Sequence, residues 1–166
     1  MREESFKYPD TEAFGFVERE LNKRDITSQD IAKMAYDVAY EFIPEAKLTE
    51  FETATIDVLH KREVLNNAMV ALDLDRLATE EKLSQPLQKI IENDAGVFGV
   101  DETLAVSIAS IYGTIGVTNF GYLDRVKSGV IRKLDTEKEG RVNTFIDDLI
   151  GALVAAVAGK MAHKYA

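Results

Sequence analysis

Acidic side chains in three short stretches are the residues of this sequence best suited to chemistry. Asp101-Glu102 opens an apolar stretch, Asp124 follows a stretch that holds aromatic residues and glycine, and Asp147-Asp148 has apolar neighbours on both sides. Acidic residues at the start of a helix ordinarily cap it and complement its dipole. A carboxylate among apolar side chains is costly to bury, however, and takes up a proton or a counter-ion. If the counter-ion is a hard divalent cation, these carboxylates would be its oxygen ligands.

Basic residues accompany these acids between positions 121 and 143. Six Lys or Arg and four Asp or Glu give this stretch a net charge of +2, although the whole chain carries −9. Spacings of three or four predict one shared helical face for Asp124, Lys127, Ser128, Ile131 and Asp135. Such charges often form surface ion pairs. Beside a carboxylate-bound metal, the basic groups would instead hold the oxygens of a phosphate.

The composition excludes several other kinds of site. The chain has no cysteine and only two histidines, His60 and His163, which lie far apart and are predicted to be structural or exposed. Thiolate metal sites are therefore excluded, two distant histidines argue against a histidine-rich metal site, and the acidic charge argues against nucleic-acid binding. The longest apolar run, 149–159, would span about 16 Å as a helix, against a hydrocarbon core of roughly 30 Å. With no leader-like start, we expect a soluble, cytoplasmic protein without a transmembrane segment.

Apolar residues recur mostly at three- and four-residue spacings, which predicts an all-α fold. We expect a loose arm, residues 1–9, within a single domain of 1–166 that forms a bundle of about six to eight helices. The first two expected helices are 11–22 and a helix from 27 or 28 that ends before Pro44. A third begins at a Thr49/Glu52 capping box and runs through 61–63 to about 72. The others are 86–93, 102–118, a helix to 134 that follows a bend or continuation at 119–121, and 144–163. Asp101 and Asn143 are the predicted N-caps of two of these helices.

The last of these helices is predicted to be the centre of the bundle. It is rich in Ala and contains Gly151 and Gly159, each of which costs up to about 1 kcal/mol relative to Ala inside a helix. Two such residues indicate that other helices pack closely against it. Because Gly151 lies one turn after Asp147, we expect it to leave room for a metal, a water or a phosphate beside that carboxylate.

At these residues the chain resembles the phosphatidylglycerophosphatase A family, over roughly 100–155. The resemblance is carried by three blocks: Val100-Asp101-Glu102, Phe120 to Lys127 continuing through Ile131 to Asp135, and Phe145 to Ala152. Ser128-Gly129 stands where the family usually has proline after the lysine. The chain is also similar to the soluble branch of that family in low-GC Gram-positive bacteria, the low-temperature-requirement proteins, through 61–64 and 91–94.

The resemblance implies a magnesium-dependent phosphatase, with Mn²⁺ as an alternative, that converts phosphatidylglycerophosphate to phosphatidylglycerol. The metal ligands implied by position are Asp101, Glu102, Asp124, Asp147 and Asp148. Glu102, Asp124 and Asp148 are the implied catalytic residues, with either Glu102 or Asp148 as the general base.

The resemblance also assigns the phosphate partners and leaves the substrate open. Lys127 and Arg132 would bind the substrate phosphate, and Asp135 is a weaker candidate that would bind metal or orient Arg132. The substrate is then an anionic phosphate ester, either a lipid reached by peripheral membrane contact or a soluble molecule.

Two rival functions remain from the residues themselves. An all-helical nucleotide pyrophosphohydrolase would share an acidic metal site, but its Glu-x-x-Glu and Glu-x-x-Asp spacings do not occur in this sequence. A non-catalytic helical protein would instead form a homo-oligomer or bind a phosphate-bearing ligand.

Overall fold

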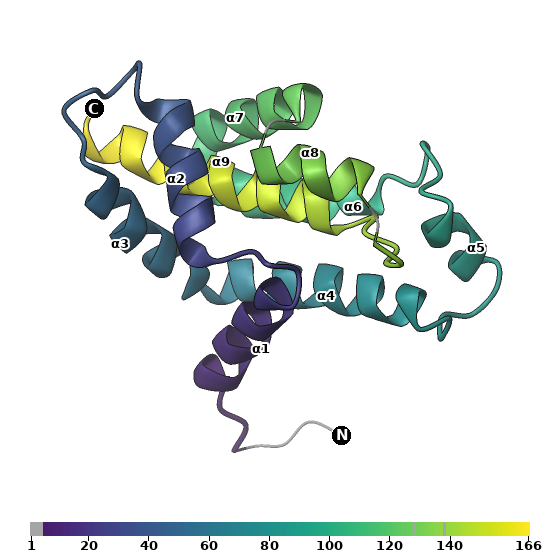
Figure 1. Ribbon diagram of the computed structural model, residues 1–166. Coiled ribbons are helices and arrows are strands. Elements are labelled where there is room, and N and C mark those ends of the chain that lie inside the picture. The colour runs from purple at the N-terminus through teal and green to yellow at the C-terminus, as the bar shows by residue number, and fades with distance from the viewer. Residues whose placement is uncertain (1–4, 128, 138) are drawn as a thin grey trace.

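A computed structural model describes residues 5–127, 129–137 and 139–166, which form helices and connecting segments without a strand (Figure 1). This confirms the predicted all-α fold. The elements are α1 (Asp10–Asn22), α2 (Ser28–Ala39), α3 (Leu48–Leu59), α4 (Arg62–Thr79), α5 (Leu87–Glu92), α6 (Val100–Ala109), the 3₁₀ helix η1 (Ser110–Tyr112), α7 (Gly113–Val126), α8 (Gly129–Thr136) and α9 (Ile146–Lys164). Residues 1–4 of the predicted arm, Ser128 and Lys138 lie outside the described residues.

Helix α9 is the centre of the bundle, as its Ala- and Gly-rich sequence predicts. Every residue from Ile146 to Gly159 is buried, and α2, α3, α6, α7 and α8 all pack against this helix (Figure 1). A Cβ added to Gly159 would lie 3.1 Å from Tyr112 Cβ and 3.2 Å from the backbone nitrogen of Gly116. The close approach of α7 therefore accounts for this glycine.

Helices α6 and α7 form a hairpin along α9. Helix α6 starts beside the first turn of α9, and the chain reaches Tyr112, whose carbonyl oxygen lies 3.1 Å from His163 Nε2 near the other end of α9. Gly113 then adopts a φ of +71°, which favours glycine, and the chain reverses. Helix α7 returns along α9, so that the Phe120 ring lies against Gly151.

The hairpin corrects the predicted helix over 102–118 and its bend at 119–121. The reversal occurs earlier, at η1 and Gly113, and α7 continues through 119–121 to Val126. Apolar residues continue at helical spacing across this turn, so the pattern does not reveal it.

The helix predicted from Thr49 past residue 63 is also divided. His60 and Lys61 separate α3 from α4, where Lys61 is extended. The start of α3 is capped by the Glu50 carboxylate, which accepts a hydrogen bond of 3.0 Å from the Lys47 backbone N–H, and not by the predicted Thr49/Glu52 pair.

Neither predicted N-cap, Asp101 or Asn143, occupies that position. Gly99 precedes α6 and Phe145 precedes α9. The Phe145 backbone N–H instead donates a hydrogen bond of 3.0 Å to the buried Asp75 carboxylate of α4. At α9, a side chain from another helix thus replaces the local cap predicted at Asn143.

Among the described residues, one stretch, Val100–Val126, is long and apolar enough by length and composition to cross a membrane, with a mean hydropathy of 1.3 over an 18-residue window. This is not the 149–159 run considered from the sequence. Here it forms the two arms of the hairpin, of 10 and 14 residues. Each arm is about 15–21 Å long, which is shorter than a hydrocarbon core of roughly 30 Å.

Candidate metal centre

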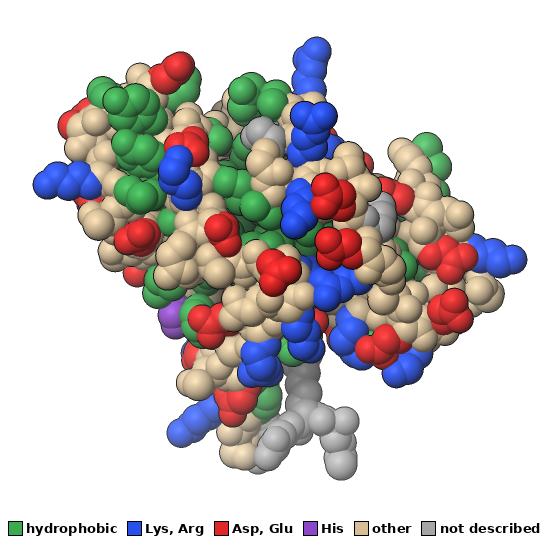
Figure 2. Space-filling model, viewed as in Figure 1, with side chains coloured by type: hydrophobic (Ala, Val, Ile, Leu, Met, Phe, Trp, Pro, Cys, Tyr) green, Lys and Arg blue, Asp and Glu red, His purple; other side chains and the backbone are tan. Residues whose placement is uncertain are grey.

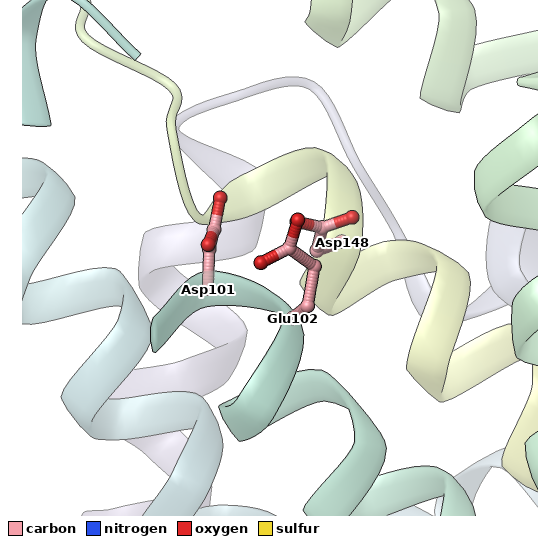
Figure 3. Close-up of side chains that lie close together, drawn as sticks. All are labelled: Asp101, Glu102 and Asp148. Carbon is pink, nitrogen blue, oxygen red and sulfur yellow. The ribbon is translucent and has the colours of Figure 1, made fainter. Parts of the chain in front are cut away.

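Three carboxylates from two helices meet at one end of the bundle. Asp101 and Glu102 lie in the first turn of α6, and Asp148 lies in the first turn of α9 (Figure 3). One carboxylate oxygen from each lies within 4.8 Å of the others. Asp101 and Asp148 are buried, with 8% and 7% of their surface exposed, whereas Glu102 is exposed. We refer to these three residues as the acid cluster.

Burial and crowding in the acid cluster disfavour the ionised form of its two buried carboxyl groups. Burial raises the pKa of Asp148 to about 9, and the charges of Asp147, Asp101 and Asp124 add to this effect. Burial also raises the pKa of Asp101 to about 6, together with hydrogen bonding to Glu102 and the charge of that residue. Asp101 Oδ1 is buried and has no hydrogen-bond partner among the described residues. These carboxylates therefore call for protons or a cation as compensation.

Asp124 approaches the acid cluster from the end of α7. Its half-buried carboxylate is close enough for its charge to raise the pKa of Asp148, although it is not among the three tightly grouped residues. An unbroken helix would place Asp124 about 33 Å from Glu102, at 1.5 Å per residue. The hairpin turn at Gly113 thus brings this predicted residue to the site.

Asp147, the neighbour of Asp148, faces a different environment. Lys127 Nζ donates hydrogen bonds to Asp147 Oδ2 at 3.0 Å and to Asp135 Oδ1 at 3.1 Å. Burial raises the pKa of Asp147, and the hydrogen bond and charge of Lys127 oppose this rise. Burial lowers the pKa of Lys127, but its two carboxylate partners outweigh burial and raise it overall. We refer to these three residues as the ion-pair network.

A model of the family described as phosphatidylglycerophosphatase A matches residues 27–163. The chain belongs to the phosphatidylglycerophosphatase A family. The uncharacterized protein YpjQ of Bacillus subtilis is 38% identical over 159 residues, which cover 96% of this chain and 89% of YpjQ. The crystal structure of low temperature requirement C protein from Listeria monocytogenes is 40% identical, covers 92% of this chain and 96% of that chain, and has a TM-score of 0.87. A protein of unknown function from Bacillus stearothermophilus is 38% identical, with 98% of both chains covered and a TM-score of 0.88.

The matches confirm the resemblance and its low-temperature-requirement branch. In this family member, the three blocks of similarity come together at one end of the bundle. The first block supplies Asp101 and Glu102 at the start of α6, the second supplies Asp124 and Lys127 at the end of α7, and the third begins α9. The fold thus brings the three blocks close to one another at the start of α9.

The structure corrects the predicted helical face from Asp124 to Asp135. Lys127 has a φ of +42° and ends α7, so Lys127 and Asp135 do not lie on one continuous helix. Asp135 contacts Lys127 in place of Arg132, which is exposed on α8 and forms no ion pair with a described residue. The two predicted phosphate partners therefore differ, because Lys127 already pairs with acids and Arg132 faces solvent.

Gly151 does not leave room for a metal beside Asp147. A Cβ at this position would lie 3.6 Å from the Phe120 ring and 3.9 Å from Ile131 Cδ1, both apolar groups. The prediction was wrong because position 151 faces α7 and α8, and not the acid cluster. The space beside this glycine accommodates helix packing.

Asp75 is a buried carboxylate near the site that the sequence interpretation missed. Burial raises its pKa to about 7, while hydrogen bonds from the Phe145 and Ile146 backbone and the charge of Arg24 oppose this rise. It holds the start of α9, which carries Asp147 and Asp148. Its position among Ala71, Leu72 and Ala78 on the apolar side of α4 was the available signal.

Proposed function

We propose that this chain is a Mg²⁺-dependent phosphomonoester hydrolase that releases the terminal phosphate of phosphatidylglycerophosphate. The observation that supports it most is the acid cluster, three carboxylates within 4.8 Å of which two are buried. The family match supports the reaction class. In the reaction, the oxygen of a water molecule bonds to phosphorus, the bond from phosphorus to the ester oxygen breaks, and the lipid alcohol leaves with a proton.

The acid cluster fits a hard divalent cation held by oxygen. The orphaned, buried Asp101 Oδ1 and the raised pKa of Asp148 both indicate a place where positive charge would be stabilising. Carboxylate oxygens are the ligands that Mg²⁺ uses in proteins. When bound, the cation would offset the carboxylate charges, polarise the phosphate and lower the pKa of a water molecule. Mn²⁺ suits the same ligands.

The three residues of the acid cluster would have different roles, because they differ in burial. Asp101 and Asp148 are enclosed and would hold the cation, whereas the exposed Glu102 can reach an incoming water molecule. We assign Glu102 as the group that accepts the proton of the attacking water. Asp124, at the end of α7 beside the acid cluster, would be a further carboxylate ligand of the cation.

The basic residues nearby would hold the substrate. The ammonium of Lys127 has three N–H donors, of which Asp147 and Asp135 use two. The third donor remains for a phosphate oxygen, so Lys127 would link the substrate to the first turn of α9. Arg132 is exposed and free to turn toward the phosphate of a bound substrate, where its guanidinium can hold two oxygens at once.

The test measures inorganic phosphate released from phosphatidylglycerophosphate in detergent micelles, with Mg²⁺ or with EDTA. We expect release only with Mg²⁺, and a fall of about 100-fold or more in Asp148→Asn, because cation assistance is worth several kcal/mol. The matched control is Asp57→Asn, an exposed carboxylate paired with Lys160, which should retain wild-type activity.

Calorimetric titration with Mg²⁺ and Mn²⁺ separates the remaining outcomes. Absence of binding at millimolar concentrations would disprove the metal assignment. Binding together with hydrolysis of soluble phosphomonoesters alone would reject the lipid substrate. Binding without turnover of any phosphomonoester would favour a phosphate-ligand-binding protein over an enzyme.

A further inference from the structure

Between its two charged ends, the outer surface of the α6–α7 hairpin carries no charged side chain. From Thr103 to Leu123 the sequence has 21 residues without Asp, Glu, Lys or Arg, although 30% of the chain is charged. Fifteen of these residues are not buried. We call them the neutral hairpin surface. By contrast, Lys, Arg, Asp and Glu side chains lie close together over the α1, α5 and α8 regions in Figure 2.

Large apolar side chains are exposed along this neutral hairpin surface. Val106, Ile115 and Val117 are 38%, 40% and 38% exposed, and Tyr122 is 57% exposed. Thr and Ser residues lie between them, namely Thr103, Ser107, Ser110, Thr114 and Thr118. Loss of charge, and not apolarity alone, distinguishes the centre of a protein–protein interface from ordinary surface. The neutral hairpin surface has this character over both helices.

Two kinds of partner suit an uncharged helical surface, a bilayer or a protein. Helices that lie on bilayers carry large apolar residues on one face and Lys or Arg on the other, because membrane surfaces are negatively charged. The neutral hairpin surface has neither Lys nor Arg, and the whole chain has a net charge of −9. Its uncharged mixture of apolar and hydroxyl side chains favours contact with another helical surface of the same kind.

We propose that the neutral hairpin surface binds the same surface of a second copy of this chain. Two chains of net charge −9 repel each other, so a stable contact between them must avoid opposing carboxylates. A two-fold contact through Thr103–Leu123 does so, because no residue of either surface is charged. Its fifteen non-buried residues, with Val100 and Val126 beside them, approach the roughly 20–30 residues a side of a stable interface.

This contact is independent of the proposed phosphatase activity. Glu102 and Asp124 flank the charge-free stretch in sequence and lie at the open end of the hairpin, next to Asp148. Pairing through the neutral hairpin surface thus brings two acid clusters into one assembly, while the charged ends of the hairpins lie at the margin of the contact.

Sedimentation velocity over a range of protein concentrations tests the proposal. The variants are Val117→Lys and Thr114→Lys, which each place a charge on α7, and the control is Val70→Lys on α4, where Val70 is 48% exposed. We expect the wild type and the control to sediment with twice the mass of one chain. Each α7 variant should raise the dissociation constant of the dimer by about tenfold or more, because an unpaired charge in an interface is costly.

Thr114→Lys removes no apolar side chain, and circular dichroism of each variant is measured to check that its helices are retained. A wild-type protein that stays monomeric at near-millimolar concentration would overturn the proposal. Dimers of unchanged affinity in both α7 variants would place the interface elsewhere. Monomers that bind phosphatidylcholine vesicles, with binding lost in Val117→Lys, would identify the neutral hairpin surface as a membrane contact instead.

Discussion

Asp147 and Asp148 are neighbours at the start of α9, and they show two different uses of a buried carboxylate. They are 6% and 7% exposed. Asp147 receives a hydrogen bond of 3.0 Å from Lys127, whereas Asp148 faces Asp101 and Glu102. Adjacent positions of a helix point in different directions. One turn of α9 therefore serves the ion-pair network on one side and the acid cluster on the other.

The difference lies in where the compensating charge originates. In the ion-pair network Lys127 supplies that charge, so the buried Asp147 carboxylate is compensated without an added ion. In the acid cluster no described Lys or Arg forms an ion pair with Asp148, and burial with three neighbouring acids raises its pKa to about 9. Carboxylates whose pKa is raised by burial and by neighbouring acids cluster at functional sites. Substitutions in the two groups should have opposite consequences.

Activity should show the largest contrast between the two groups. Glu102→Gln should reduce phosphate release about 100- to 10,000-fold, the range for loss of a general base, while Mg²⁺ binding persists through the two buried acids. Asp135→Asn, which leaves Lys127 its hydrogen bond to Asp147, should reduce release less than about tenfold. Initial rates at saturating Mg²⁺ measure both. Equal losses in the two variants would contradict the division into catalytic cluster and supporting network.

Asp75 is an intermediate case, a buried carboxylate compensated chiefly by backbone N–H groups. Its pKa of about 7 when folded lies above the value near 3.8 when unfolded, so ionisation opposes folding. Its contribution to stability is full below about pH 4 and is lost as the pH rises toward 7. In EDTA, the free energy of unfolding of the wild type should therefore fall between pH 5 and 8, relative to Asp75→Asn, by on the order of 2–3 kcal/mol. Urea unfolding of both proteins measures this, and a constant difference across the pH range would reject it.

Without metal, substitutions in the acid cluster and in the ion-pair network should change the free energy of unfolding in opposite directions. At pH 8 in EDTA, Asp148→Asn should be about 1–3 kcal/mol more stable than the wild type, because Asn is neutral where ionisation is penalised. Lys127→Gln should be about 1–3 kcal/mol less stable, because it leaves Asp147 buried without its cation. Adding Mg²⁺ should raise the melting temperature of the wild type but not of Asp148→Asn. If both variants were destabilised alike, the acid cluster would be a structural feature.

The helices and the residue types of the site could be predicted from local sequence, but their pairing could not. Ala and Gly in 146–159 indicate a buried helix, and acids among apolar residues indicate a functional cluster. The Gly113 reversal has no such signal, because apolar spacing continues across it. The bond from Phe145 to Asp75 joins residues 70 apart, and Lys127 reaches Asp147 across 20 residues. These contacts depend on tertiary packing, which sequence periodicity does not encode.

Packing of the hairpin gives the smallest expected effect and links the fold to the acid cluster. A Cβ at Gly116 would overlap the Ala109 carbonyl oxygen, whereas one at Gly151 would meet the Phe120 ring at an ordinary 3.6 Å. Ala is favoured over Gly in a helix by about 1 kcal/mol, and overpacking costs typically 1–3 kcal/mol.

Gly116→Ala should therefore lose about 1–2 kcal/mol of unfolding free energy, while Gly151→Ala should be neutral or more stable. Relief of the overlap at position 116 would displace α7 and with it Asp124. Gly116→Ala should therefore also bind Mg²⁺ more weakly than Gly151→Ala. Thermal unfolding and calorimetry on the two variants measure both quantities. Loss of stability with unchanged Mg²⁺ affinity would show that Asp124 lies outside the ligand set and would restrict the metal centre to Asp101, Glu102 and Asp148.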